Sequence, residues 1–289
     1  MSPLTKRLIN YSGTLFAIIG LIFITFRLYS YNILTLLSNY SFSDWVIISG
    51  LILVYGLSNI LLSIAWWQIL AGLDLKVDFF WAIRTYAITQ ITKYVPGNIF
   101  QFVGRQALGM AKGLPTWSLA KSSIWEVGLI AFSGSLFVFF VLPVFIKSNY
   151  INIWTCFILF ILTVNLTFFS IKKYLSPKFA YAFLCYICFL IISSLLFFNL
   201  LFLHNKSFEI VSLDNVFIVG SAYVVAWLAG LITPGSPAGV GVRELVLLFL
   251  LSGIIQESNL LTAILLGRLV TIGGDILFYF SYAMNKIKR

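Results

Sequence analysis

A short polar pattern that could bind an anion occurs twice in an otherwise apolar sequence. The first copy is the tripeptide Pro96-Gly97-Asn98, with Arg105 seven residues after the Asn. The second copy is Pro234-Gly235-Ser236, with Arg243 seven residues after the Ser. In each copy a Pro-Gly break precedes a residue that favours a helix N-cap, and the arginine lies two turns further on the same face. The pattern therefore predicts two helices that begin at a break, each with a guanidinium near its start.

These predicted helix starts have the chemistry of a phosphate site. Asn98 and Gln101 form a variant of the capping box, and Ser236 precedes a proline, which is favoured at the first helical position. Free backbone N–H groups and the positive end of the helix dipole attract anions, and arginine adds a forked donor that fits phosphate. Gly239 and Gly241 keep the second start open to a ligand or another backbone. The alternative for both arginines is that they extend to the lipid headgroups.

Further charged residues are predicted to lie deep in the membrane. Glu126 and Arg268 each lie nine residues into an apolar helix, those starting at Trp117 and Asn259. At ~1.5 Å per residue each side chain is ~13 Å deep, from opposite faces, so we predict an ion pair between them near the midplane. Asp275, two turns from Arg268 on the same face, is a competing partner. Ionisable residues at that depth are functional candidates, and a purely structural ion pair is the alternative.

The elements that must position these residues are membrane-spanning helices. Of the 289 residues, 61% are hydrophobic and 10% are charged, whereas soluble domains have about 25% charged residues. Apolar stretches of about 18 to 25 residues are long enough to cross a hydrocarbon core of ~30 Å. They lie near 12–29, 45–71, 117–145, 150–171, 179–203, 213–232 and 259–283. No small-residue cleavage site follows the first stretch, so we expect it to be retained as a span.

These stretches predict an all-α polytopic integral membrane protein, in which residues 1–289 form a single transmembrane domain. Both polar motifs fall in predicted helical hairpins, at 79–113 and 213–254. Broken backbone at membrane depth must be buried in protein or line a wet cavity. We therefore expect six full spans plus two broken or re-entrant hairpins, which makes up to eight hydrophobic passes.

The predicted elements fall into two similar halves, residues 45–147 and 179–283. Each half has the order helix, hairpin, helix, and the two halves cross the membrane in opposite senses. Residues 12–29 form an extra first span, and residues 150–171 form a span that links the halves. This order predicts an inverted-topology repeat, as in many transporters. The alternative is that the Pro-Gly turns only join consecutive helices.

The distribution of basic residues predicts the orientation of the chain. The formal net charge is +10, but the bases are scattered along loops that flank the apolar stretches, which argues against nucleic-acid binding. With the N-terminus inside, fourteen of the nineteen bases fall on the cytoplasmic side, while Lys147 and Lys206 fall outside. We therefore expect a multi-pass protein of the cytoplasmic (inner) cell membrane with both termini cytoplasmic.

The sequence offers little for metal or redox chemistry. Cys185 and Cys188 have CxxC spacing, but they lie in an apolar stretch and no second pair accompanies them. His204 is the only histidine. We therefore expect neither a metal nor another cofactor.

Two stretches resemble the signature regions of a known family. They are KYVPGNIFQFVGRQALG at residues 93–109 and TPGSPAGVGVRELVLLFLL at residues 233–251. The family is the lysylphosphatidylglycerol synthase transmembrane family, which includes the flippase domain of the bacterial multiple peptide resistance factor and stand-alone flippase-like proteins. The resemblance spans nearly the whole chain. The residues that it carries over are Lys93, Pro96, Gly97, Gln101, Gly104, Arg105, Pro234, Gly235, Gly239, Gly241, Arg243 and Glu244.

The resemblance implies a stand-alone member without the soluble aminoacyl-transferase domain of the fused proteins, so synthesis of an aminoacylated lipid is not expected. There is also a difference from the family pattern. Family members often have a Glu-Arg pair with a following Asp after the first motif, whereas Glu126 is followed by Val127 and no Asp comes after it in that helix. The identity of the substrate therefore does not transfer directly.

The residues and the resemblance together predict a lipid flippase or transporter. Its substrate would be an anionic or zwitterionic amphiphile, namely a phospholipid, an aminoacylated lipid or a polyprenyl-linked saccharide, with the headgroup between the two hairpins. One alternative is a membrane-embedded glycosyl- or lipid-modifying enzyme, although Glu126, Glu244 and Asp275 are too scattered to predict a catalytic site. Another is a non-transporting partner in envelope polysaccharide assembly.

Overall fold

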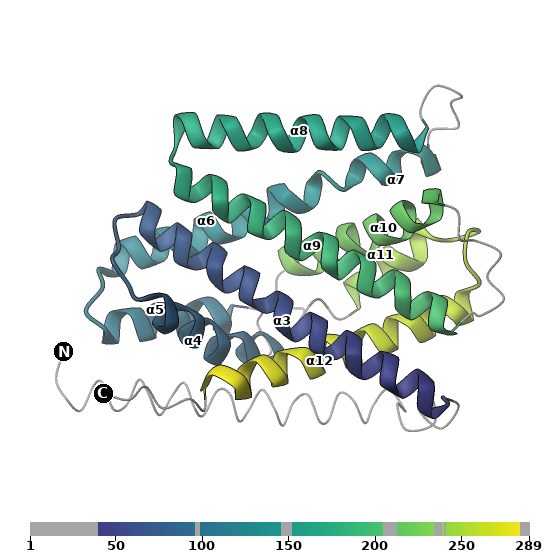
Figure 1. Ribbon diagram of the computed structural model, residues 1–289, viewed down its shortest axis with the longest axis horizontal. Coiled ribbons are helices and arrows are strands. Elements are labelled where there is room, and N and C mark those ends of the chain that lie inside the picture. Colours follow the sequence, from purple (N-terminus) through teal and green to yellow (C-terminus); the bar gives the residue numbers. More distant parts are fainter. Residues whose placement is uncertain are drawn as a thin grey trace.

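The computed structural model is a bundle of helices (Figure 1). It describes residues 40–95, 99–145, 152–204, 213–233, 239 and 241–283, and no strand occurs in these ranges. The helices are α3 (Phe42–Gly72), α4 (Phe79–Gln90), the 3₁₀ helix η1 (Ile91–Tyr94), α5 (Phe100–Ala111), α6 (Thr116–Ser135), α7 (Val138–Phe145), α8 (Ile153–Tyr174), α9 (Pro177–His204), α10 (Leu213–Ile232), α11 (Val242–Leu250) and α12 (Glu257–Ala283).

Within the described residues, six helical segments are long and apolar enough to cross a membrane, which is the pattern of a multi-pass membrane protein. They are Phe42–Gly72, Thr116–Pro143, Ile153–Tyr174, Pro177–Leu203, Asp214–Ile232 and Glu257–Tyr282. The all-helical prediction and the predicted spans from 45–71 onward are confirmed. The segment 213–232, expected as one arm of a hairpin, is long enough to cross alone. The predicted first span, 12–29, lies outside the described residues.

The first predicted hairpin region contains two short helices that contact each other. α4 and α5 have 12 residues each, so each is ~18 Å long and shorter than a ~30 Å hydrocarbon core. The helix η1 extends α4 by four residues. The segment 96–98 lies outside the described residues. α5 also packs against α6, so Arg105 of the first motif is held beside α6.

The second motif region is arranged around another short helix. α11 has nine residues and packs against both α10 and α12. Residues 234–238 and 240 lie outside the described part of the chain. Glycine allows the backbone just before α11 to adopt unusual angles, since Gly239 and Gly241 have φ of 70° and 86°. The chain can therefore turn sharply into α11 within a few residues.

Side-chain caps fix where several of the helices begin, and α3 and α4 are examples. At the start of α3, the backbone N–H of Ser41 donates to Asp44 Oδ2 at 3.0 Å. At the start of α4, Asp78 Oδ2 accepts a hydrogen bond of 3.0 Å from the backbone N–H of Trp81. Each cap satisfies a backbone group that has no partner inside the helix. The cap at Asp78 therefore sets the register with which α4 carries Tyr86 into the protein interior.

The long helices α3, α9 and α12 pack against one another at the centre of the bundle (Figure 1). Gly56 of α3 and Gly274 of α12 meet at one crossing, where a Cβ on Gly56 would lie 3.1 Å from the Gly274 carbonyl oxygen. Small residues at such a crossing let two helix backbones approach closely, which is a common way to hold membrane helices together. The position of α12 against α3 therefore depends on these glycines.

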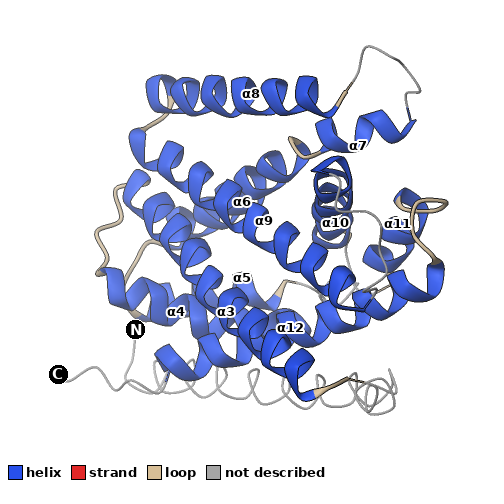
Figure 2. Ribbon diagram, turned by 45° about the vertical axis from the view of Figure 1, so that its right-hand side comes forward, coloured by secondary structure: helices blue, strands red, loops and turns tan. Residues whose placement is uncertain are grey.

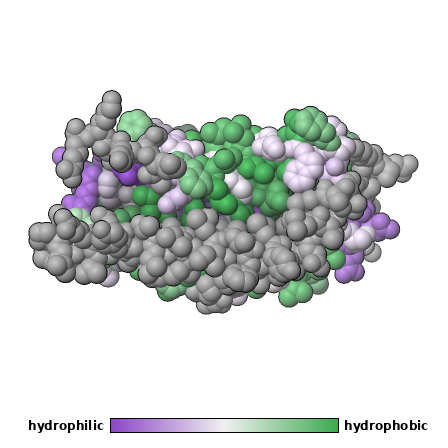
Figure 3. Space-filling model, turned by 90° about the horizontal axis from the view of Figure 1, so that it is seen from below, coloured by the Kyte–Doolittle hydropathy of each residue, from purple (hydrophilic) through white to green (hydrophobic). Residues whose placement is uncertain are grey.

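The outer surface is apolar over the middle of the molecule. α8 forms an outer layer against α9 and α7 (Figure 2), and it exposes Leu162, Leu166 and Phe169. Among the coloured atoms of Figure 3, apolar residues fill much of the middle and hydrophilic residues gather toward the two ends of the long axis. We expect exposed apolar side chains to face lipid acyl chains, because they carry no polar group that would need a hydrogen-bond partner there.

Candidate functional site

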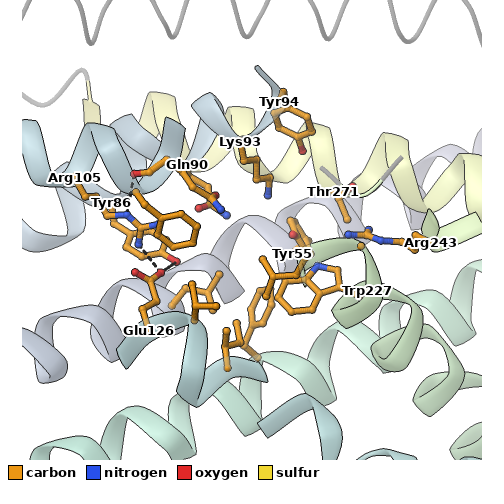
Figure 4. Close-up of a pocket in the computed structure, with 18 of the residues that line it drawn as sticks. Tyr55, Tyr86, Gln90, Lys93, Tyr94, Arg105, Glu126, Trp227, Arg243 and Thr271 are labelled. Atoms are coloured by element: carbon orange, nitrogen blue, oxygen red, sulfur yellow. Dashed lines mark hydrogen bonds and ion pairs between the residues drawn. The ribbon is translucent and has the colours of Figure 1, made fainter. Parts of the chain in front are cut away.

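A cavity lies at the centre of the bundle, between the two motif regions (Figure 4). Its volume is about 70 Å³, smaller than the roughly 300–1,000 Å³ of typical small-molecule pockets. It can hold a small polar group but not a whole lipid. The lining residues come from nearly every core helix: Tyr55, Leu62, Tyr86, Gln90, Lys93, Tyr94, Gln101, Phe102, Arg105, Glu126, Val127, Ile130, Phe189, Trp227, Gly230, Leu231, Arg243, Arg268 and Thr271.

Arg105 of α5 forms a buried ion pair with Glu126 of α6. The distance from Arg105 Nη1 to Glu126 Oε1 is 2.5 Å, and the two residues are 2% and 4% exposed. The hydroxyl of Tyr86 donates to the same carboxylate oxygen at 3.0 Å, and the guanidinium lies 4.2 Å from the centre of the Tyr86 ring. Arg105 also donates from Nε to the carbonyl oxygen of Gln101 at 3.2 Å. It therefore points into the protein, and the alternative that it extends to the lipid headgroups is wrong.

Lys93 of η1 forms a second ion pair, with Asp275 of α12. Lys93 Nζ lies 2.6 Å from Asp275 Oδ2, and Asp275 is completely buried. The Tyr94 hydroxyl donates to Oδ2 at 2.5 Å, and Asn59 Nδ2 donates to Oδ1 at 3.1 Å. A buried carboxylate needs such partners, because an unpaired one would be costly away from water. Asp275 of α12 therefore joins α12 to the first motif region through Lys93 and Tyr94, and to α3 through Asn59.

Arg268 of α12 forms a third ion pair, with Glu244 of α11. Arg268 Nε and Nη2 donate to Glu244 Oε1 at 3.0 and 2.7 Å, and Nη2 also donates to the Gly239 carbonyl oxygen at 3.2 Å. The other carboxylate oxygen of Glu244 accepts a 2.7 Å hydrogen bond from the Gly241 N–H. Glu244 therefore caps α11 and fastens the second motif region to α12.

The predicted ion pair between Glu126 and Arg268 is wrong, because each of these residues has a different partner. The competing assignment of Arg268 to Asp275 is also wrong. Equal depth fixes the position of a side chain along the membrane normal, but not the direction in which it leaves the helix. Both α6 and α12 pack against α3 and α9, but α6 otherwise packs against α5 and α10, whereas α12 packs against α4 and α11.

The two glycines near α11 were predicted to admit a ligand or another backbone, and at Gly239 it is a backbone that comes close. Gly239 packs against Gly230 of α10, and a Cβ on Gly239 would lie 2.8 Å from the Gly230 Cα. A Cβ on Gly241 would have open space around it, although the N–H of Gly241 is engaged by Glu244. Gly239 therefore lets α10 approach the segment that leads into α11.

Arg243 of α11 is the exception among the basic residues of the cavity. It is 9% exposed, and its Nε is buried with no hydrogen-bond partner in the described part of the chain. Its guanidinium lies 5.9 Å from the centre of the Tyr223 ring, and no carboxylate among the described residues forms an ion pair with it. In Figure 4 this guanidinium points from α11 toward the side of the cavity that Tyr55 and Trp227 occupy.

The structure thus brings together most of the predicted site residues. Lys93, Gln101, Arg105 and Arg243 line the cavity, and Glu244 lies behind Arg268. The predicted caps and breaks lie outside the described residues, namely Pro96, Gly97, Asn98, Pro234, Gly235 and Ser236.

Sequence reasoning missed three polar groups that complete the site. They are Asn59, Tyr86 and Tyr94, and each donates a hydrogen bond to one of the buried carboxylates. Asn59 carried a usable signal, because an amide in the middle of an apolar span must find a partner. The tyrosines did not, because tyrosine is also common at membrane interfaces.

Within the described residues, no group of three or more His, Cys, Asp or Glu residues could hold a metal ion. Comparison of the chain with protein-family models, with curated proteins and with solved structures finds no match. The function therefore has to be argued from the cavity and its charges.

Proposed function

We propose that this protein moves the headgroup of an amphiphilic lipid across the membrane through the central cavity, while the acyl or prenyl chains stay in the bilayer. The observation that carries the proposal is that two motif regions, remote in sequence, contribute basic side chains to one cavity among apolar helices. Lys93 and Arg105 come from the first region and Arg243 from the second. We also propose, from the resemblance of both motifs to its signature regions, that the chain belongs to the flippase-like family, which would imply the same function.

The cavity chemistry suits a headgroup better than an acyl chain. Charged groups are rare and costly at membrane depth, yet five of them line this one interior space, namely Lys93, Arg105, Glu126, Arg243 and Arg268. Because the cavity is only about 70 Å³, it admits part of a headgroup in this arrangement of the helices, and translocation requires the surrounding helices to separate. An inverted repeat with two re-entrant hairpins would supply that motion as one half rocks against the other, and we propose this architecture for the chain.

The observed contacts favour transport over the enzymatic alternative. General acid-base catalysis needs a carboxyl group that is free to exchange a proton with the substrate. Glu126, Glu244 and Asp275 are each held in an ion pair with a basic residue. These carboxylates are therefore better suited to joining helices and neutralising basic residues than to acid-base chemistry on a substrate.

Reconstitution tests the proposal directly. Purified protein is placed in liposomes that contain lipids with fluorescent headgroups, and an impermeant quencher measures how fast the inner-leaflet lipids reach the outside. We expect protein to accelerate this movement for a subset of headgroups. Arg243→Ala should remove the acceleration, whereas Lys121→Ala, at an exposed position on α6, should retain it. If no lipid in an anionic, zwitterionic and polyprenyl panel moves faster than in empty liposomes, transport of lipid headgroups is ruled out.

A further inference from the structure

When the ion-pair partners of the cavity residues are counted with them, the basic side chains exceed the acidic ones by one. The three ion pairs are Lys93–Asp275, Arg105–Glu126 and Arg268–Glu244, with N–O distances of 2.6, 2.5 and 2.7 Å. Each pair brings together one positive and one negative charge. Arg243 is the remaining cation that lines the cavity, so the cavity and its ion-pair partners carry a net charge of one positive unit.

Arg243 has no ion-pair partner among the described residues. Of its nine acidic residues, all but Glu209 lie in the described ranges, and none of those forms an ion pair with Arg243. The neighbouring residues that are not described, 234–238 and Val240, include neither Asp nor Glu. Arginine stays protonated in proteins, so this buried group cannot escape its charge by losing a proton. A buried and unpaired cation is unfavourable, and an anion from outside the chain would relieve that cost.

We propose that Arg243 binds the phosphodiester group of a lipid headgroup that carries a single net negative charge. This inference rests on the proposed function and specifies its substrate class. A guanidinium can donate two parallel hydrogen bonds to two oxygens of one phosphate. Tyr55 and Trp227 lie on the same side of the cavity, and their O–H and N–H groups supply further donors (Figure 4).

The charge count decides between headgroup classes. One negative charge neutralises the excess positive charge of the cavity. A diphosphate brings additional negative charge into a space of low polarity, where it has no counter-charge. An aminoacylated headgroup with a net positive charge places an ammonium close to Arg243, and like charges repel there. Anionic glycerophospholipids and polyprenyl monophosphate sugars both carry the favoured group.

A binding series with the purified wild-type protein in detergent tests this inference. The dissociation constants are measured for phosphatidylglycerol, a polyprenyl monophosphate sugar, a polyprenyl diphosphate and lysyl-phosphatidylglycerol. At least one of the first two should bind about tenfold or more tightly than the last two. The tighter of the first two identifies the glycerol or the polyprenyl source. If the diphosphate or the lysyl lipid binds as tightly as the tighter of the two monoanionic lipids, the inference is overturned.

Three variants then test the role of Arg243. Arg243→Gln removes the charge and should weaken binding of the preferred lipid about ten- to hundredfold, because charge-assisted hydrogen bonds are lost. Arg243→Lys keeps the charge but not the fork, and its affinity should fall between those of Arg243→Gln and the wild type. Lys121→Gln should bind as the wild type does. Unchanged affinity in Arg243→Gln would overturn the assignment, and the wild-type series decides the headgroup class even if that variant fails to fold.

Binding and transport can fail separately. If the monoanionic lipid binds through Arg243 but no lipid crosses the liposome membrane, the inference stands and the proposed transport function fails. If lipids cross without any preference for a single negative charge, transport stands and the inference fails.

Discussion

Breaking the ion pair between Arg105 and Glu126 should destabilise the protein strongly, and the structure sets the scale. The two side chains are 2% and 4% exposed and their charged atoms are 2.5 Å apart, so removing either partner leaves a buried charge without its main counter-charge. Such a loss typically costs about 3–5 kcal/mol. The Tyr86 hydroxyl still reaches Glu126 in Arg105→Gln, so we expect that variant at the lower end of this range.

A double-mutant cycle measures the interaction itself. The free energy of unfolding is compared for wild type, Arg105→Gln, Glu126→Gln and the double variant in the same detergent. Because the double variant leaves neither charge behind, it should be more stable than the sum of the single losses predicts, with a coupling energy of about 1–3 kcal/mol. The matched control is the cycle of Glu126→Gln with Arg268→Gln, which should be additive within about 0.5 kcal/mol. Additivity in the first cycle would refute the pairing that the structure shows.

Three other outcomes are expected. Arg243→Gln should be at least as stable as the wild type in lipid-free detergent, because it removes an unpaired buried charge, and a lowered melting temperature would contradict this. Gly274→Ala should lower the melting temperature and destabilise the protein by about 1–3 kcal/mol, because its Cβ would lie 2.8 Å from a backbone nitrogen of α3. The control is Gly50→Ala, which has open space around its Cβ and should leave the melting temperature unchanged. In intact cells, the Lys147→Cys variant should react with an impermeant thiol reagent, whereas the Lys288→Cys variant should not. The reverse pattern would invert the orientation that we predict from the basic residues.

The long helices were predictable because their signal is a simple length of apolar sequence. The stretch 45–71 corresponds to α3 at Phe42–Gly72, and 179–203 corresponds to α9 at Pro177–His204. The short helices of the first motif region, α4 with η1 and then α5, also fall within the predicted hairpin at 79–113. A run of apolar residues fixes how far a helix can extend, so these boundaries follow from composition alone.

The partners of the buried charges were not predictable in the same way. The prediction for Glu126 and Arg268 used depth, which the position along a helix gives, but an ion pair also requires two helix faces to meet. Arg105 lies only 21 residues from Glu126 in sequence, and α5 and α6 are consecutive helices that pack together. Consecutive helices should therefore have been tested first as sources of a partner. The lack of a partner for Arg243 could not be seen in the sequence, because it depends on where every acidic residue lies.

Both motif regions are fastened to the same face of α12, and this restricts how the cavity can open. Arg268 and Asp275 are seven residues apart, so they project from one face of that helix two turns apart. Arg268 holds Glu244 of the second region, and Asp275 holds Lys93 of the first. The pair between Arg105 and Glu126 instead fastens the first region to α6, on another side of the cavity. The rocking of one half against the other that we propose would move residues 45–147, which include the first motif region and α6, away from residues 179–283, which include α12. The Lys93–Asp275 pair joins the two halves and therefore has to break when the cavity opens, whereas the pairs Arg105–Glu126 and Arg268–Glu244 each lie within one half and can be kept.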